Sequence, residues 1–299
     1  MAISKGRIVV HILLLMYAAI LGYVLLGLIF HFSISADIFF DLSFVLLFFA
    51  LAQAFFELGR RRALIFVVLS AAIGFLAEVL GTSTGIPFGK YSYGDLLGPK
   101  VLGVPIVVPL VWFVIAYIAL SMVEGGVSGR IGSRSAGAFS TSTSAVPGPD
   151  ANHGSRNYLL IALLAAFGAM SWDLLIDPMF SSYQYWTWDS NQFFSIPTLS
   201  GIPLTNFVGW FVIVFLVISA YLLLVPRGGL VLRRRNTIDS VTVYSMLTID
   251  GVIANWSLGH SFVIAIGSAA MIAFILLSLT WPRLLRSSDR PSASTRTSL

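Results

Sequence analysis

Three acidic side chains lie in strongly apolar segments of this sequence, where an ionisable group is costly to bury. Glu78 stands near the end of one such segment, and Asp173 and Asp177 stand near the end of another. Residues four apart share one face of a helix, so the two aspartates are expected to interact and to share a proton. A protonated and an ionised carboxyl group in one site can donate and accept protons, which predicts general acid–base catalysis by Glu78, Asp173 and Asp177.

Structural roles are the alternative for these acids. Glu78 could cap the loop that follows it by accepting hydrogen bonds from Thr82 or Thr84. The Asp177-Pro178 dipeptide could simply begin a turn at the end of a helix.

Aromatic residues follow each acidic segment, and part of their pattern is repeated. Phe88-x-x-Tyr91-x-Tyr93 recurs as Phe180-x-x-Tyr183-x-Tyr185, and Gly103-Val-Pro105 with Trp112 recurs as Gly201-Ile-Pro203 with Trp210. Tyr and Trp are common where helices meet the membrane interface, which explains many of them without a site. Their repetition beside carboxyl groups instead favours a site that holds an apolar polyene and stabilises a carbocation through the faces of the rings.

The composition is that of a membrane protein. Hydrophobic residues make up 57% of the chain, charged residues only 10%, and the mean hydropathy is +0.90. A helix needs about 20 apolar residues to cross the hydrocarbon core. Eight segments are predicted to do so: Ile8–Phe30, Ala36–Glu57, Ala63–Leu80, Pro105–Val123, Tyr158–Ile176, Leu204–Val225, Ser240–Trp256 and Ser261–Trp281.

Two further acids, Asp41 and Asp250, lie in the outer halves of predicted spans and are weaker candidates for the site.

Lys and Arg favour cytoplasmic loops, and this preference predicts the topology. In an eight-span chain with cytoplasmic termini, Lys90 and Lys100 are the only basic residues on the outer side. A seven-span chain would export the four arginines near the C-terminus. We therefore predict an all-α, polytopic protein of the cell membrane with about eight transmembrane helices and both termini cytoplasmic.

The repeat predicts how the two acidic segments are related. Each copy enters from the cytoplasm, carries its motif outside and returns, which makes the copies parallel repeats of two helix pairs. A pseudo-two-fold axis along the membrane normal would bring both acidic helices and both aromatic strings together at the outer face. Residues 1–286 are predicted to form one transmembrane domain, with a flexible cytoplasmic linker at 124–156 and a disordered tail at 287–299.

Several kinds of chemistry are not expected. The chain has no cysteine, and its four histidines are scattered without ligand spacing, so we predict no metal, no haem and no other cofactor. The net charge of +5 follows from the topology, and no basic patch is interleaved with exposed aromatic residues. A nucleic-acid partner is therefore not expected.

The segment from Glu78 through Tyr91 and Tyr93, the Trp172-Asp173 to Asp177-Pro178 stretch and Gly201-Ile-Pro203-Leu-x-Asn206-x-x-Gly-Trp210 carry a family resemblance. They resemble the membrane carotenoid-biosynthesis proteins of the CruF type, the carotenoid hydratases, over roughly residues 63–225. The resemblance implies addition of water across the terminal carbon–carbon double bond of an acyclic (psi) carotenoid end, which gives a tertiary alcohol. It implies a C40 monocyclic carotenoid or the C50 precursor of bacterioruberin as substrate. The basic, Ser-rich loops and the total of only 13 acidic residues slightly favour the C40 compound, since extreme halophiles usually carry acidic surfaces.

In such a reaction a carboxylic acid, Glu78 or one of the aspartates, would protonate the alkene, and an ionised partner would take a proton from the attacking water. The residues expected to bind substrate are Tyr91, Tyr93, Trp112, Trp172, Tyr183, Tyr185, Asn206 and Trp210. The expected partners are the carotenoid, water and membrane lipid, with association with other carotenoid-pathway enzymes as a further expectation. The competing hypotheses are a membrane transporter and a non-catalytic carotenoid-binding protein.

Overall fold

The structure is a computed structural model that describes residues 5–32, 38–124, 151–191, 197–225 and 234–288. The described residues form eight α-helices: α1 (Lys5–Phe30), α2 (Ile38–Leu58), α3 (Arg60–Thr84), α4 (Val108–Glu124), α6 (Ala151–Ser182), α7 (Leu204–Leu224), α8 (Arg234–Ser257) and α9 (Ser261–Ser288). A helix therefore occurs at each of the eight predicted segments, and the predicted all-α class is confirmed.

Five of these helices are long and apolar enough to cross a membrane: α1, α3, α6, α7 and α9. The apolar parts of α2 and α4 are shorter, Leu42–Leu58 and Val108–Glu124. Large apolar side chains are exposed on the outer helices, for example Leu15 on α1, Val68 on α3 and Ile272 on α9. Exposed apolar surface of this kind suits contact with lipid chains and would be unfavourable in water.

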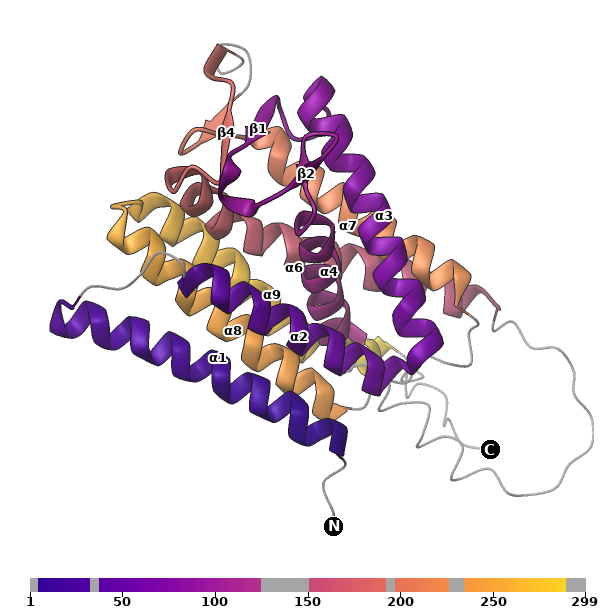
Figure 1. The fold of residues 1–299 in the computed structure, drawn as a ribbon. Helices are drawn as coiled ribbons and strands as arrows, with labels where there is room; N and C mark the ends of the chain where they lie inside the picture. The colour runs from indigo at the N-terminus through magenta and orange to yellow at the C-terminus, as the bar shows by residue number, and fades with distance from the viewer. Residues whose placement is uncertain (1–4, 33–37, 125–150, 192–196, 226–233, 289–299) are drawn as a thin grey trace, which may run out of the picture.

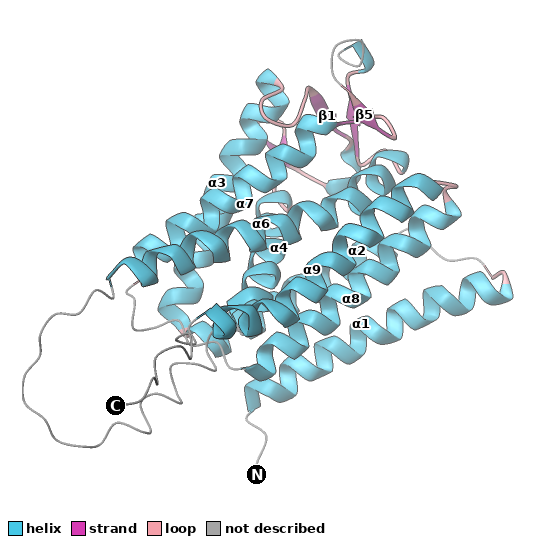
Figure 2. Cartoon of the chain, turned by 180° about the vertical axis from the view of Figure 1, so that it is seen from behind, coloured by secondary structure: helices cyan, strands magenta, loops and turns pink. Residues whose placement is uncertain are grey.

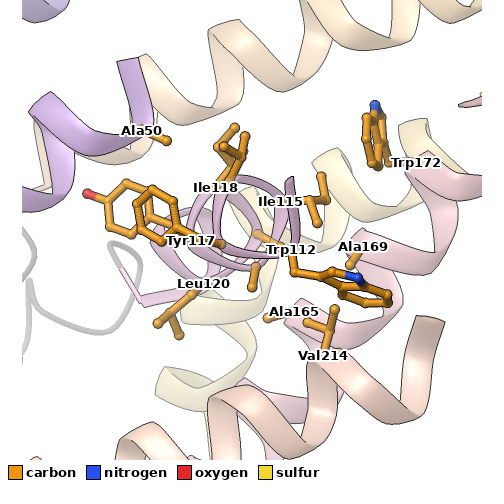
Figure 3. Close-up of a cluster of buried hydrophobic side chains, with 14 of the residues drawn as sticks. Ala50, Trp112, Ile115, Tyr117, Ile118, Leu120, Ala165, Ala169, Trp172 and Val214 are labelled. Carbon is orange, nitrogen blue, oxygen red and sulfur yellow. The ribbon is translucent and has the colours of Figure 1, made fainter. Parts of the chain in front are cut away.

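Helix α4 is the centre of the molecule, because every residue from Trp112 to Glu124 is buried. Figure 3 looks along this helix, and its side chains point outward in all directions into the surrounding helices. A helix that is apolar on all sides is typical of the interior of a large bundle or of a membrane span. Helices α2, α3, α6, α7, α8 and α9 all pack against α4.

The arrangement of the other helices follows from this centre (Figures 1 and 2). Helix α1 lies on one side of the molecule against α2 and α8, while α3 and α7 lie on the opposite side, with α4 and α6 between them. Leu175 of α6 fits between Gly251 of α8 and Gly267 of α9, where added Cβ atoms would collide with it. The Tyr244 hydroxyl also donates to the carbonyl of Gly168 at 2.6 Å and ties α8 to α6.

Short strands gather at one end of the bundle. β1 (Tyr91–Tyr93) pairs antiparallel with β4 (Trp186–Trp188), so the loops that follow α3 and α6 are hydrogen-bonded to each other. The other strands form two hairpins, β2 (Lys100–Val101) with β3 (Val104–Pro105) and β5 (Thr198–Leu199) with β6 (Ile202–Pro203). A 3₁₀ turn, η1 (Asp95–Leu97), precedes the first hairpin.

The two hairpins have the same turn. Leu102 and Gly103 have φ values of 51° and 82°, and Ser200 and Gly201 have φ values of 49° and 80°. Two consecutive positive φ angles define the tight turn that matches the twist of two strands. Each hairpin leads directly into the next helix, α4 or α7.

Some boundaries differ from those expected. Phe88 lies in the loop after α3, but Phe180 lies inside α6, so the two Phe-x-x-Tyr-x-Tyr strings have different conformations. Helix α6 begins at Ala151, within the segment expected to be a linker, and it continues through Pro178 to Ser182. The rest of the expected linker, and the expected tail beyond 288, lie outside the described residues.

The pairing of β1 with β4 can be tested by a disulfide, since the chain has no native cysteine. Ser92 and Thr187 are opposite each other, and opposed residues of an antiparallel pair are about 4.5 to 5.5 Å apart, a separation that a disulfide spans. Under mild oxidation, Ser92→Cys with Thr187→Cys should form an intramolecular crosslink, visible as a reducible change in gel mobility. The control, Lys90→Cys with Thr187→Cys, is out of register and should remain uncrosslinked. Equal crosslinking of both pairs would contradict the register.

Candidate functional site

Glu78 is the best-connected acid of the site. It lies on the last two turns of α3 and is only 5% exposed. The Trp112 indole donates to its Oε1 at 2.9 Å, and the Tyr93 hydroxyl donates to its Oε2 at 2.7 Å. The Tyr91 hydroxyl donates to the same Oε2. Three donors from α4 and β1 therefore converge on one buried carboxyl group.

The Glu78 side chain does not cap the following loop, because neither Thr82 nor Thr84 donates a hydrogen bond to its carboxyl group. The Thr82 hydroxyl donates to the backbone carbonyl of Glu78 at 2.9 Å, and the Thr84 hydroxyl donates to that of Leu80 at 2.7 Å. Both threonines thus bond to the helix backbone, as is common for hydroxyl side chains four residues on. The Glu78 carboxyl group is left to the aromatic donors.

The hydroxyl groups of Tyr91 and Tyr93 are held in their protonated form. Burial raises the pKa of both tyrosines well above the usual value, and the nearby Glu78 carboxylate raises it further. These hydroxyls are therefore hydrogen-bond donors at any physiological pH.

Asp173 and Asp177 form the second part of the site with Asn206 of α7. Both acids are buried, with exposures of 0% and 2%, and one amide bonds to both. Two negative charges this close in an apolar site repel each other, which favours a proton on one member of the pair. The Asn206 amide donates to Oδ2 of Asp173 at 2.8 Å and to Oδ2 of Asp177. The pair is therefore expected to share a proton and is held by one amide.

Both parts of the site face one cavity of about 130 Å³. A single water molecule needs about 10 to 15 Å³ of such space, so the cavity has room for much more than one. Glu78, Asp177 and Asn206 line it, while the walls between them are aromatic and aliphatic. The acids therefore meet in a space that suits an apolar ligand and a few polar groups.

Tryptophan rings form much of the wall beside the acids. Trp112 and Trp210 stack with centroids 4.1 Å apart, and Trp172 stands edge-on to Trp210 at 5.8 Å. Figure 3 shows Trp112 and Trp172 on the same side of α4. Gly74 lies directly against the Trp112 ring, where any larger residue would collide with it. The faces and edges of these rings are thus fixed by packing.

Most of the predicted site residues are brought together here. The cavity is lined by Glu78, Tyr91, Tyr93, Trp112, Trp172, Asp177, Asn206 and Trp210. Asp173 is not among the lining residues, but it accepts a hydrogen bond from Asn206, which is. Tyr183 and Tyr185 are not among the lining residues; Tyr185 packs on Phe180 with ring centroids 4.8 Å apart. The side chain of Asp41 lies outside the described residues.

Trp186 and Trp188 were missed as site residues. They lie on β4 opposite Tyr93 and Tyr91, and both line the cavity. The Trp188 indole also donates to the carbonyl of Phe88 at 3.1 Å. The two-residue spacing of these tryptophans equals that of Tyr91 and Tyr93, and this alternation was the signal that could have found them. Tyr17 of α1 and Asp250 of α8 also line the cavity.

The arrangement can perform proton transfer on an apolar molecule. It offers a proton-sharing pair of acids, a separate carboxyl group with three donors, and aromatic faces between them. Within the described residues, no group of three or more ligating side chains is placed to hold a metal ion.

Comparison with known proteins identifies the family of the chain. A family model described as carotenoid biosynthesis protein matches residues 39–276. Bisanhydrobacterioruberin hydratase of Haloarcula japonica is 28% identical over 164 residues, which is 54% of this chain and 45% of that protein. The match thus spans less than half the length of this relative, and no solved structure matches the chain. Because the family model covers most of the sequence, the chain belongs to the carotenoid biosynthesis protein family.

Proposed function

We propose that the chain is a cofactor-independent carotenoid hydratase that adds water across the terminal double bond of an open-ended carotenoid. The observation that carries the proposal is the pair of carboxyl sites on one aromatic cavity, Asp173–Asp177 with Asn206 and Glu78 with Tyr91, Tyr93 and Trp112. Hydration of an alkene needs an acid, a base and stabilisation of a cation. The name of the hydratase relative supports the same reaction class.

The aspartate pair is the proposed proton donor. Asp177 is the member that lines the cavity, so its carboxyl group delivers the proton to the less substituted carbon of the terminal alkene. The Asn206 amide stabilises the carboxylate that remains, since it donates a hydrogen bond to Asp177, and its bond to Asp173 holds that residue beside Asp177. Asp173 is thus a positioning residue, and Asp177 is the catalytic acid.

Glu78 is the proposed base. Three donors stabilise its ionised form. The tertiary cation formed by protonation lies between the tryptophan faces, and water adds to it while Glu78 takes one proton from that water. The balance is one alkene and one water consumed and one tertiary alcohol formed. Return of a proton from Glu78 to the aspartate pair restores the starting state.

We propose that the substrate reaches this site from within the bilayer. A carotenoid is a lipid, and the walls of the cavity are apolar apart from the named polar groups. Both the C40 monocyclic and the C50 substrates remain candidates, and the relative's name favours testing the C50 compound. Binding of other pathway enzymes is not needed for the reaction.

The membrane topology completes the proposal. We propose eight spans, both termini in the cytoplasm and the strands β1 and β4 on the outer side. The distribution of Lys and Arg and the presence of a helix at each predicted segment support this topology. The equal turns of the two hairpins support a parallel repeat of α3–α4 and α6–α7.

The proposal is tested by pigment analysis of a host that accumulates an open-ended carotenoid. Expression of the chain should give a product heavier by one molecule of water, detected by chromatography with mass detection. Asp177→Asn and Glu78→Gln should each lower the product by about 100-fold or more, because acid–base catalysis contributes about 10² to 10⁴ in rate. Asp189→Asn, which changes a loop acid outside the cavity, is the matched control and should keep full activity.

The outcomes separate the competing functions. Unchanged pigment with both C40 and C50 substrates, despite confirmed membrane expression, would exclude the hydratase and favour transport or binding. Wild-type activity in Glu78→Gln and Asp177→Asn would leave hydration standing but remove both acids from the mechanism.

The hydrogen bond from Trp112 to Glu78 gives a second prediction. Trp112→Phe keeps a ring in the stack but removes the donor to Oε1, so it should lower kcat by about tenfold, as expected for loss of a hydrogen bond to a charged group. Trp210→Phe removes an indole from the same stack without removing a donor to Glu78, and its kcat should fall less. Initial rates with purified protein in lipid nanodiscs would measure both. Equal losses would assign Trp112 a packing role only.

A further inference from the structure

A second polar pair lies in the same cavity, away from the three acids discussed above. Tyr17 of α1 and Asp250 of α8 both line the cavity, and the Tyr17 hydroxyl donates a hydrogen bond to the Asp250 carboxyl group. Both residues are buried, with exposures of 2% and 6%. Ser43 is the one other polar residue that α1, α2 and α8 contribute to this wall in the described part of the chain.

The pair belongs to a different part of the fold from the acid–base site. Glu78, Asp177 and Asn206 come from α3, α6 and α7, whereas Tyr17 and Asp250 come from α1 and α8. Helix α1 and helix α3 lie on opposite sides of α4 in both views (Figures 1 and 2). The polar residues of the cavity therefore come from two sets of helices, and apolar residues of α4, such as Val111 and Ile115, also line it.

Asp250 is incompletely paired. Its Oδ1 is buried and has no hydrogen-bond partner among the residues that the structure describes. A buried acceptor without a partner is unfavourable, and most such atoms in proteins bind a water or a ligand. Since Asp250 lines a cavity with room for water, a donor inside the cavity can satisfy this oxygen.

The chemistry of the wall restricts what that donor can be. A cationic donor would have to lose its hydration in an apolar cavity, which is far more costly than burying a neutral hydroxyl group. We propose that Asp250, oriented by Tyr17, binds a hydroxyl group in the cavity, either that of a water molecule or that of an alcohol on an isoprenoid ligand. The site would hold the hydroxyl compound apart from Glu78 and Asp177.

The test uses binding and spectroscopy, so that it does not depend on hydratase activity. Protein in lipid nanodiscs would carry Asp177→Asn, to prevent conversion of a ligand, alone or with Asp250→Leu, Asp250→Asn or Tyr17→Phe. Two polyenes of equal length are the probes, one ending in a tertiary alcohol and one in the corresponding alkene. Their Kd values follow from quenching of tryptophan fluorescence, and bound water follows from infrared O–H stretching bands that shift in oxygen-18 water.

An alcohol ligand predicts that Asp250→Leu weakens binding of the alcohol by up to about tenfold, the usual effect of losing one hydrogen bond, and leaves the alkene unchanged. A water ligand predicts that the Kd values stay the same but that one oxygen-18-sensitive band is lost. In either case Asp250→Asn, which keeps an acceptor oxygen and the side-chain shape, should retain most of the effect. Tyr17→Phe should give a smaller loss than Asp250→Leu.

The proposal is overturned if Asp250→Leu changes neither the Kd values nor the bands. It is also overturned if both polyenes lose affinity equally in Asp250→Leu and Asp250→Asn, because that would show a role in packing. Loss of carotenoid hydration in the cell assay would leave these measurements unaffected, so failure of the proposed reaction and failure of this site can be told apart.

Discussion

A carboxyl group inside a bundle of apolar helices is tolerated only when other groups hydrogen-bond to it, because no bulk water solvates it there. Three acids meet that requirement near one cavity, and much of the local structure exists to supply their donors. The loop after α3 turns back so that Tyr91 and Tyr93 reach Glu78. Helix α7 places Asn206 between Asp173 and Asp177. Removing Asn206 would take the amide donor from both aspartates, and removing Tyr91, Tyr93 or Trp112 would leave Glu78 with two of its three donors.

The central helix α4 makes this arrangement possible. It is apolar on every side and is covered by six other helices, so it gives the bundle a rigid axis from which Trp112 projects. The same ring contacts Gly74 of α3, stacks on Trp210 of α7 and donates to Glu78. One side chain thus couples three helices to the acid. The position of the cavity, with its aromatic walls, follows from this packing.

The sequence predicted the helices and most of the cavity residues, but not how the two halves meet. Long apolar runs predict helices well, and Glu78 lies close in sequence to Tyr91, Tyr93 and Trp112. Trp186 and Trp188 were missed because their role depends on pairing with a strand some 95 residues away, which no local pattern encodes. The string around Phe180 was aligned with that around Phe88, yet α6 continues past Pro178 and places Phe180 in a helix. Asp250 was undervalued because its partner, Tyr17, lies on a distant helix.

The hydrogen bonds of the acids have a consequence for biogenesis. Every donor to Glu78 lies between residues 78 and 112, and Asp173, Asp177 and Asn206 lie between residues 173 and 206. Each half of the chain can therefore hydrogen-bond these acids as it leaves the ribosome and enters the bilayer, before the other half is present. The pairing of β1 with β4, the stack of Trp112 on Trp210 and the packing of α4 against α6 and α8 need both halves. Two separately synthesised fragments, divided between α4 and α6, would each carry a complete hydrogen-bonded set and could assemble afterwards in the membrane.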